Sequence, residues 1–219
     1  MNPVTVTLRR EEPADYREVE SLIREAFWNH YTPGCSEHYL AHILRDSPAF
    51  VPELDILAEA DGKIVGHILY SQGRILLDAG GELPVLSFGP IAVLPSCQGQ
   101  GVGGQLIQHT LALAREAGKN AVLIYGDPVY YSRFGFKPAE AYGIGTADNR
   151  YLPSLQAYEL QPGALKNARG RFAEASEFAA EPTDVEAFDT QFPPKEKVSD
   201  TPSQQRFLTL IRQGRPRNA

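Results

Sequence analysis

A glycine-rich loop, Gln98-Gly99-Gln100-Gly101-Val102-Gly103-Gly104, is the stretch of this chain best suited to bind a ligand. It lies between an apolar run at 85–95 and an amphipathic stretch that predicts a helix over 102–117. Because glycine has no Cβ, backbone N–H groups can crowd around one point, and the start of a helix adds unpaired N–H groups and a partial positive charge. The loop therefore predicts a binding site for an anion such as a diphosphate, and with it a phosphorylated cofactor.

The spacing of the glycines narrows the choice of cofactor. The P-loop pattern G-x-x-x-x-G-K-[ST] is absent, since Lys119 is far from the loop. Gly99, Gly101 and Gly104 do satisfy the dinucleotide pattern G-x-G-x-x-G, and Asp127 follows at about the distance expected for a ribose contact. That pattern belongs to a first strand–helix–strand unit, whereas a long stretch of chain precedes this loop. A dinucleotide site is therefore the weaker interpretation.

A second motif, Tyr131-Ser132-Arg133-Phe134-Gly135-Phe136, lies downstream of the loop. The loop fits the pattern [QR]-x-x-G-x-[GA] and the second motif fits Y-x-x-x-G-F, so the pair resembles the GNAT superfamily of N-acetyltransferases, in particular a bacterial subgroup. The resemblance covers roughly residues 4–178. It implies an α/β (α+β) domain with the GNAT fold, in which a central mixed, mostly antiparallel sheet is flanked by helices and splayed at the acyl-CoA site. It also implies acetyl-CoA as co-substrate and no metal.

The resemblance indicates roles for individual residues. Tyr131 would be the catalytic general acid, because a phenol of pKa about 10 stays protonated at neutral pH and can protonate a thiolate whose thiol has a pKa of about 8.5. The main chain near Gly89-Pro90 is expected to splay, which would expose backbone groups for the pantetheine arm. The residues expected to bind the cofactor are Ile91, Val93, Gln98, Gly99, Gln100, Gly101, Val102, Gly103 and Gly104.

No residue is assigned as the general base. Many GNAT proteins carry a glutamate on the strand before the loop, but Ser87-Phe88-Gly89-Pro90 contains no carboxylate. Asp127, which precedes a proline, predicts the N-cap of a short helix that Gly135 ends. Glu59 fits a solvated strand charge and His67 a hydrogen-bonded histidine, so neither is assigned as the base.

The composition fits a cytoplasmic enzyme. A chain of 219 residues, 42% of them hydrophobic, can bury one good core and leave an extension. Its net charge of −6 argues against binding to nucleic acid or to an anionic membrane. The sequence has no apolar signal region at its start and no run of about 18 apolar residues that could span a bilayer. Cys35 and Cys97 have no metal-binding spacing, so we expect reduced thiols.

The rest of the pattern alternates between strands and helices. Strands are predicted at 4–8, 55–60, 63–70, 85–94, 121–125, 155–160 and 170–175, and helices at 13–27, 36–45, 102–117 and 127–135. Asp61-Gly62 predicts a hairpin turn, and 170–175 is expected to form a hairpin with 155–160. In the helix at 127–135, Tyr130 and Phe134 are expected to pack together in the core while Tyr131 faces elsewhere.

Aromatic and imidazole side chains gather between residues 28 and 52. They could line a pocket for the acceptor amine or simply pack a helix against a loop, and the sequence favours neither. Metal binding by the histidines is not expected, because no carboxylate or cysteine has a suitable spacing. The members of this group are Trp28, His30, Tyr31, His38, Tyr39 and His42.

Two parts of the chain are predicted, an acyl-CoA-binding GNAT domain at 1–179 and a C-terminal extension at 180–219. In the extension, Thr183-Asp184-Val185-Glu186 predicts a capping box that starts a helix, and Ser203 predicts the cap of a second helix. The second helix carries apolar side chains whose exposure would be unfavourable. The extension is therefore expected to pack on the core or on a second subunit, as in a homodimer.

The predicted function is transfer of an acetyl or other short acyl group from acetyl-CoA to the amine of a small molecule or a peptide. A neutral amine attacks the thioester, backbone N–H groups stabilise the oxyanion, and a thiolate leaves. Two rivals stay open: an acyl-CoA sensor without catalysis and, less favoured, an NAD-dependent oxidoreductase. No nucleic acid or membrane partner is expected. The sequence leaves the acceptor and the acyl length open.

Overall fold

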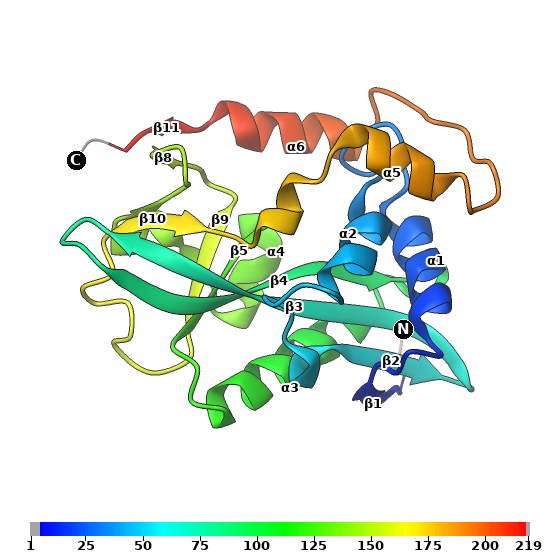
Figure 1. Ribbon diagram of the computed structural model, residues 1–219, viewed down its shortest axis with the longest axis horizontal. Helices are drawn as coiled ribbons and strands as arrows, with labels where there is room; N and C mark the ends of the chain where they lie inside the picture. The colour runs from blue at the N-terminus through cyan, green and yellow to red at the C-terminus, as the bar shows by residue number, and fades with distance from the viewer. Residues whose placement is uncertain (1–4, 218–219) are drawn as a thin grey trace. The chain divides into compact units, whose positions relative to one another are not determined.

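A computed structural model describes residues 5–217 as alternating strands and helices (Figure 1). The strands are β1 (Thr7–Arg10), β2 (Ile56–Ala60), β3 (Lys63–Leu77), β4 (Glu82–Val93), β5 (Ala121–Tyr125), β6 (Lys137–Pro138), β7 (Ile144–Gly145), β8 (Arg150–Tyr151), β9 (Leu155–Glu159), β10 (Gly170–Ala173) and β11 (Arg215–Pro216). The helices are α1 (Tyr16–Phe27), α2 (Glu37–Leu44), α3 (Val102–Glu116), α4 (Pro128–Tyr131), α5 (Pro182–Asp189) and α6 (Pro202–Arg212). Among residues 5–217, no helix has both the length and the apolar character needed to cross a membrane.

The chain divides into two compact units, and β3 and β4 run through both. The first unit contains the residues up to Tyr70, Gly89–Thr110 and Ser176–Gln205. The second contains Ser71–Phe88, Leu111–Ala175 and the residues from Arg206 on. The predicted C-terminal extension is thus shared between the units. The proposed boundary near residue 180 stays a prediction.

In the first unit, β1 pairs antiparallel with β2, and β2 pairs antiparallel with the start of β3. The predicted hairpin turn is confirmed, because Ala60 lies opposite Lys63 and the two turn residues, Asp61 and Gly62, have φ of 50° and 72°. Both φ values lie in the left-handed region that this two-residue turn requires. Of the strand predicted at 4–8, Val4 lies outside the described residues, and β1 begins at Thr7.

Two helices of the first unit, α1 and α2, lie side by side (Figure 1). The apolar stripe of α1 buries Val19, Leu22 and Ile23, as its helical spacing predicts. α1 begins at Tyr16 rather than at the predicted Pro13, because the Asp15 N–H bonds to the carbonyl of Glu12 in a preceding turn. α2 agrees with its prediction to within one residue at each end.

The second unit is built around β5. This strand pairs antiparallel with β9, which pairs with β6 on its other side. Among the described residues, the parallel pairing of β4 with β5 is confined to Leu86 opposite Val122, so the two strands diverge after a single register pair. The core of this unit contains Ile75, Leu123, Ile144, Leu155, Ala157 and Phe172.

The predicted hairpin between 155–160 and 170–175 is wrong. β10 pairs antiparallel with the end of β3, with Phe172 opposite Ile75, and parallel with β7. Both edges of β9 are already occupied by β5 and β6, so β9 offers no edge to β10. The prediction relied on order along the chain and could not show which edges were free.

Two caps in the C-terminal region differ from prediction. α5 begins at Pro182 after Glu181, so Thr183 lies inside the first turn and forms no capping box. Proline is favoured at the first helical position, since its missing N–H would be unpaired there in any case. α6 begins at Pro202, and the hydroxyl of Thr201 accepts from the Gln204 N–H at 3.3 Å. Thr201 therefore takes the capping role expected of Ser203.

Candidate functional site

The glycine loop keeps the space above its backbone open. Gly99 and Gly101 have φ of 74° and 87°, in the left-handed region that glycine adopts without strain. A Cβ built on either residue would meet no described atom within 4 Å. Packing against this protein therefore does not require glycine at these positions. The backbone conformation does, and so would a ligand that approached it closely.

The start of α3 faces this open space. The carbonyl of Gly101 accepts from the Gln105 N–H at 3.1 Å, so the first helical turn begins there and the N–H groups of that turn have no partner within the helix. Gly103 and Gly104 lie inside α3, and neither has a positive φ. Their backbone is therefore ordinary helix, and the lack of a Cβ at these positions would permit the close approach of a ligand.

The side chains of the two glutamines in the loop form hydrogen bonds with backbone carbonyl groups that precede it. Gln98 Nε2 donates to the carbonyl of Val93 at 3.0 Å, and Gln100 Nε2 donates to the carbonyl of Ser96 at 2.9 Å. These bonds tie the loop to the end of β4, where Ile91 and Val93 are half-buried. A pantetheine arm that used the carbonyl of Val93 would have to share it with Gln98 or displace that side chain.

Close packing of α3 on β3 holds the helix that follows the glycine loop. A Cβ on Gly66 would lie 2.9 Å from Val102 Cγ1 and 3.1 Å from Leu106 Cδ1, so only glycine lets the helix approach the strand this closely. Further along, the hydroxyls of Tyr70 and Thr110 lie 2.9 Å apart and are buried. The helix start is therefore held on a rigid strand.

The segment 126–136, in the second unit, has the local structure that the sequence predicts. Asp127 is the N-cap of α4 and accepts from the Val129 N–H at 2.8 Å, and Gly135 ends the following 3-10 turn with φ of 89°. Asp127 also binds Arg206, at 2.9 Å from Nε. This bond to Arg206 holds the pKa of the Asp127 carboxyl below its usual range. An ionised carboxylate with two partners is a structural group and a poor base.

Tyr131 is the deeper of the two adjacent tyrosines. Its side chain is only 9% exposed, and its ring centroid lies 5.9 Å from that of Phe88 and 5.7 Å from that of Phe136. Tyr130 does pack on Phe134, at 5.5 Å, as expected, but it stays half-buried. We expected Tyr130 to lie in the core and Tyr131 to face elsewhere. In the structure Tyr131 is the more deeply buried ring.

Gly126 fixes the position of the Tyr131 ring. A Cβ at Gly126 would lie 2.1 Å from Tyr131 Cε2, so any side chain at 126 would push the ring away. The predicted site residues thus fall in both units: Ile91, Val93 and the loop residues 98–104 in the first, and Tyr131 in the second.

The aromatic group at 28–52 is at least partly a packing element. His38 is fully buried, and its ring lies 5.5 Å from that of Phe188 and 5.1 Å from that of Phe192. Burial lowers the pKa of His38 to about 4, so the ring is neutral. Cys35 Sγ lies 3.5 Å from His38 Nδ1, and burial raises the pKa of that thiol. A protonated thiol beside a neutral imidazole is not an activated nucleophile.

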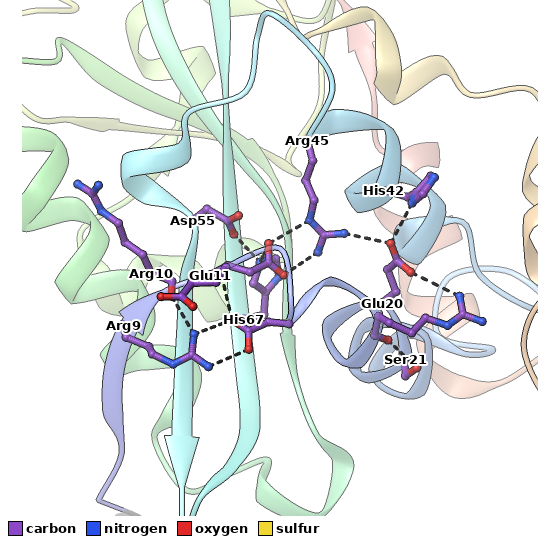
Figure 2. Close-up of polar contacts among 12 residues, drawn as sticks. Arg9, Arg10, Glu11, Glu20, Ser21, His42, Arg45, Asp55 and His67 are labelled. Atoms are coloured by element: carbon purple, nitrogen blue, oxygen red, sulfur yellow. Dashed lines mark hydrogen bonds and ion pairs between the residues drawn. The ribbon is translucent and has the colours of Figure 1, made fainter.

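A buried ionic network, made of Glu11, Glu20, Arg45, Asp55 and His67, has no counterpart in the sequence analysis (Figure 2). Arg45 binds Glu11 through Nη2 at 2.7 Å and through Nε at 3.0 Å, and it reaches Glu20 at 3.1 Å. His67 Nε2 lies 2.7 Å from Asp55 Oδ1. The members come from five separate segments, so no local spacing could have revealed them. His67 is here a hydrogen-bonded histidine, as expected; Glu59 is bound to Arg9 at 2.7 Å.

The ion pairs already present in this network decide whether it can bind a metal cation. Ligand atoms of Glu11, Asp55 and His67 lie within 4.8 Å of one another, a spacing that one cation could bridge. However, Arg45 already binds both carboxylate oxygens of Glu11, so a cation at this position would have to displace the guanidinium. Burial and the neighbouring Asp55 raise the pKa of Glu11 to about 8, while burial lowers the pKa of His67 to about 4. We therefore interpret the network as ion pairs and hydrogen bonds that retain a proton.

Comparison with known families identifies the class of this protein. Residues 7–139 match the model of the acetyltransferase (GNAT) domain. The chain therefore belongs to the GNAT acetyltransferase family, and the matched residues include both the glycine loop and Tyr131. The predicted fold class is confirmed as well, because a mixed sheet flanked by helices is what its solved structural neighbours share.

Two Escherichia coli proteins of this family are similar in sequence. The chain is 36% identical to the uncharacterized N-acetyltransferase YjhQ over 131 residues, which is 59% of this chain and 66% of YjhQ. It is 29% identical to the uncharacterized N-acetyltransferase YhbS over 163 residues, which is 74% of this chain and 92% of YhbS. In the first case the chain spans slightly less than two thirds of its relative.

Two solved structures are similar in fold. A crystal structure of Escherichia coli YhbS in complex with CoA matches with a TM-score of 0.70 and 26% identity, covering 82% of this chain and 95% of that one. A GNAT family acetyltransferase from Brucella melitensis in complex with acetyl-CoA matches with a TM-score of 0.65 and 30% identity, covering 80% of this chain and 98% of that one.

Proposed function

We propose that this protein transfers an acetyl or other short acyl group from acetyl-CoA to an amine. The observation that carries the proposal is the glycine loop, in which left-handed Gly99 and Gly101 leave open space next to the start of α3, whose first N–H groups have no partner within the helix. That geometry suits a diphosphate, and solved relatives bind CoA or acetyl-CoA. The loop residues 98–104 would hold the diphosphate, and the end of β4 at Ile91 and Val93 would hold the pantetheine arm.

Tyr131 is the proposed general acid. The attack of a neutral amine on the thioester carbonyl builds charge on oxygen and then releases a thiolate. A phenol held in place by Phe88, Phe136 and the bare backbone of Gly126 can donate its proton to that thiolate. Asp127 is excluded as a partner base by its bond to Arg206 and its role as the helix cap.

The acceptor is proposed to be an amine of a small molecule or a peptide, and the protein is proposed to act in the cytoplasm with no nucleic acid or membrane partner. A second subunit is a further proposal for the C-terminal region. The acetyl transfer proposed above does not require a metal ion. Direct transfer needs only the thioester, the amine and two proton-transfer groups.

Thiol release and calorimetry test the proposal together. Titration of the purified chain with acetyl-CoA should give saturable binding, and NAD should give none. Thiol release from acetyl-CoA should then appear with at least one member of a panel of polyamines, amino acids, aminoglycosides and lysine peptides. Binding without thiol release for any amine would indicate an acyl-CoA sensor. Binding of NAD but not of acetyl-CoA would indicate an oxidoreductase.

A further inference from the structure

The proposed reaction does not yet include a group that accepts the proton lost by the acceptor amine. An alkylamine near pKa 10.4 is mostly protonated at neutral pH and must lose a proton before it can attack. β4 offers no carboxylate near Gly89, and Asp127 and Glu59 are each bound to an arginine. His67 is buried within the ionic network. Another group must therefore take this proton.

Glu174 has the properties that these residues lack. It follows β10 directly and is half-buried, and within residues 5–217 its carboxylate has no hydrogen bond and no ion pair. Burial raises the pKa of Glu174 to about 7. A base of that pKa is ionised often enough to accept a proton at neutral pH and strong enough to hold it. A structural glutamate of this depth would normally have a partner.

The position of Glu174 connects it to the segment of Tyr131. Glu174 directly follows the last residue of β10 and lies two residues after Phe172. The ring of Phe172 lies 6.2 Å from that of Tyr125, the last residue of β5. Tyr125 is 39% exposed and immediately precedes Gly126, against which the Tyr131 ring packs. All five residues belong to the second unit.

Burial is the one cause of the raised pKa of Glu174, so no neighbouring cation among the described residues offsets it. Tyr125 on β5 is close enough for the Glu174 and Asp148 charges to raise its pKa, after burial as the main cause. Across the β10–β3 pairing, Arg74 lies opposite Ala173, but its guanidinium binds Glu82 at 3.3 Å. The surroundings of Glu174 therefore present negative charge beside an aromatic face, a combination that attracts an ammonium group.

We propose that Glu174 is the catalytic base for a cationic acceptor amine that binds beside Tyr125. This inference rests on the proposed acetyl transfer. The ammonium gives one proton to the Glu174 carboxylate, and the neutral nitrogen forms the C–N bond. As the C–S bond breaks, the sulfur takes the proton of Tyr131, and the nitrogen's remaining excess proton restores the phenol. Glu174 then releases its proton to water, so each turnover yields amide, thiol and one proton.

The pH dependence of thiol release tests this assignment, with acetyl-CoA and the best amine of the panel. In the wild type, kcat/KM for the amine should rise with pH through a limb near 7, in addition to any limb from the amine itself. Glu174→Gln should lower kcat by roughly 10²–10⁴-fold, remove that limb and leave the KM for acetyl-CoA unchanged. Formate should restore part of the activity of Glu174→Ala. Glu177→Gln, the same change three residues away, should behave like the wild type.

Each outcome decides between the two proposals. If the wild type transfers acetyl groups but Glu174→Gln keeps both its rate and the limb near 7, the Glu174 assignment fails while the function stands. If no amine releases thiol from the wild type, the function fails and the assignment fails with it. If Glu174→Gln does not fold, the wild-type profile decides, because a rate without a limb near 7 overturns the assignment.

Discussion

Polar groups are arranged differently in two regions of the molecule. One region is the pair of motif segments, 98–104 and 126–136, and the other is the buried ionic network. The motif segments are contiguous in sequence, and the glycine loop leaves the N–H groups at the start of α3 open. The network gathers its charges from five segments and buries Arg45 and Glu11 with side chains only 3% and 0% exposed. Open polar groups are free to bind a ligand, whereas the paired charges of the network hold the fold together.

This contrast predicts that function and stability separate between the two regions. Changes in the motif segments should affect binding or turnover while the protein stays folded. Changes in the network should affect the free energy of unfolding whether or not acetyl-CoA is present. Four predictions test that separation, from the largest expected effect to the smallest.

The largest effect is expected from Tyr131→Phe. Removing the hydroxyl of a positioned acid should lower kcat by roughly 10²–10⁴-fold with little change in acetyl-CoA affinity. The phenylalanine ring keeps the contacts with Phe88 and Phe136, so the melting temperature should change little. Steady-state thiol release and thermal unfolding measure the two quantities.

Tyr130→Phe is the matched control, because it removes one hydroxyl from the same short helix. Its ring packs on Phe134 and under Arg133, whose guanidinium lies 4.4 Å from the ring centroid. Turnover should stay near the wild-type value. If Tyr130→Phe is the inactive variant, or if neither substitution affects kcat, the role given to Tyr131 is wrong.

Arg45→Met should be the most destabilising change in the network. Removing Arg45 takes away the buried guanidinium that binds Glu11 and Glu20, a loss of about 3–5 kcal/mol, although Glu20 keeps Arg17 at 3.5 Å. Arg74→Met is the control, because Arg74 and Glu82 form a pair with side chains 57% and 56% exposed. Such a surface pair contributes about 0–1 kcal/mol. Urea unfolding that showed equal losses for both variants would contradict the distinction between the regions.

The motif segments could be read from sequence because their function depends on local geometry. The residues around Asp127 and Gly135 predict a capped short helix, and the structure has it. The same holds for the Asp61-Gly62 turn and for α3, which begins at Val102 and is followed by Gly118 at φ 69°. In each case the signal and the structure it specifies lie within a few residues of each other.

The features that the sequence did not predict are contacts between segments that are far apart along the chain. Nothing near Glu11 or Arg45 in the sequence indicates that they meet, 34 positions apart, at 2.7 Å. The pairing of β10 with β3 depends on β9 already having two neighbours. The depth of Tyr131 depends on Phe88 from β4. Glu174 carries no signal in the sequence for the same reason, since its burial and its lack of a partner exist only in the folded chain.

Gly101→Val should abolish acetyl-CoA binding while the fold survives. The new side chain would occupy the open space proposed for the diphosphate, and we expect a loss of at least about 100-fold in affinity, or about 2.7 kcal/mol. Valine at φ of 87° also strains the backbone by about 1–3 kcal/mol. Calorimetric titration with acetyl-CoA gives the first quantity and urea unfolding the second.

Gly62→Val separates strain from binding. Gly62 has φ of 72°, and a Cβ added there would likewise meet no described atom within 4 Å, but it lies in the β2–β3 turn. The Gly62→Val protein should lose about as much stability as Gly101→Val and keep its affinity for acetyl-CoA. Unchanged affinity in a folded Gly101→Val protein would place the diphosphate elsewhere.

The smallest effect is a change of stability with pH that isolates Glu11. Its pKa is about 8 in the folded chain and about 4.5 in an unfolded one, so between these values the folded state holds a proton that the unfolded state has lost. Stability therefore falls as pH rises, by at most about 1.4 kcal/mol per unit. His67, with a pKa of about 4 when folded and 6.5 when unfolded, has the opposite slope, but only below 6.5.

Comparison of the wild type with Glu11→Gln between pH 7 and 8 isolates Glu11, because Glu37, whose pKa burial raises, is the same in both proteins. Glu174, whose folded pKa is about 7, adds its own fall mainly below that value. Urea unfolding should show wild-type stability decreasing across this window, and Glu11→Gln, which cannot release a proton at this position, should show a clearly smaller decrease. Glu12→Gln changes the exposed neighbour in the same way and should keep the wild-type slope. A wild-type stability that rises from pH 7 to 8, or an equal fall in Glu11→Gln, would mean that Arg45 keeps Glu11 ionised. In that case the proton of the network would not reside on Glu11.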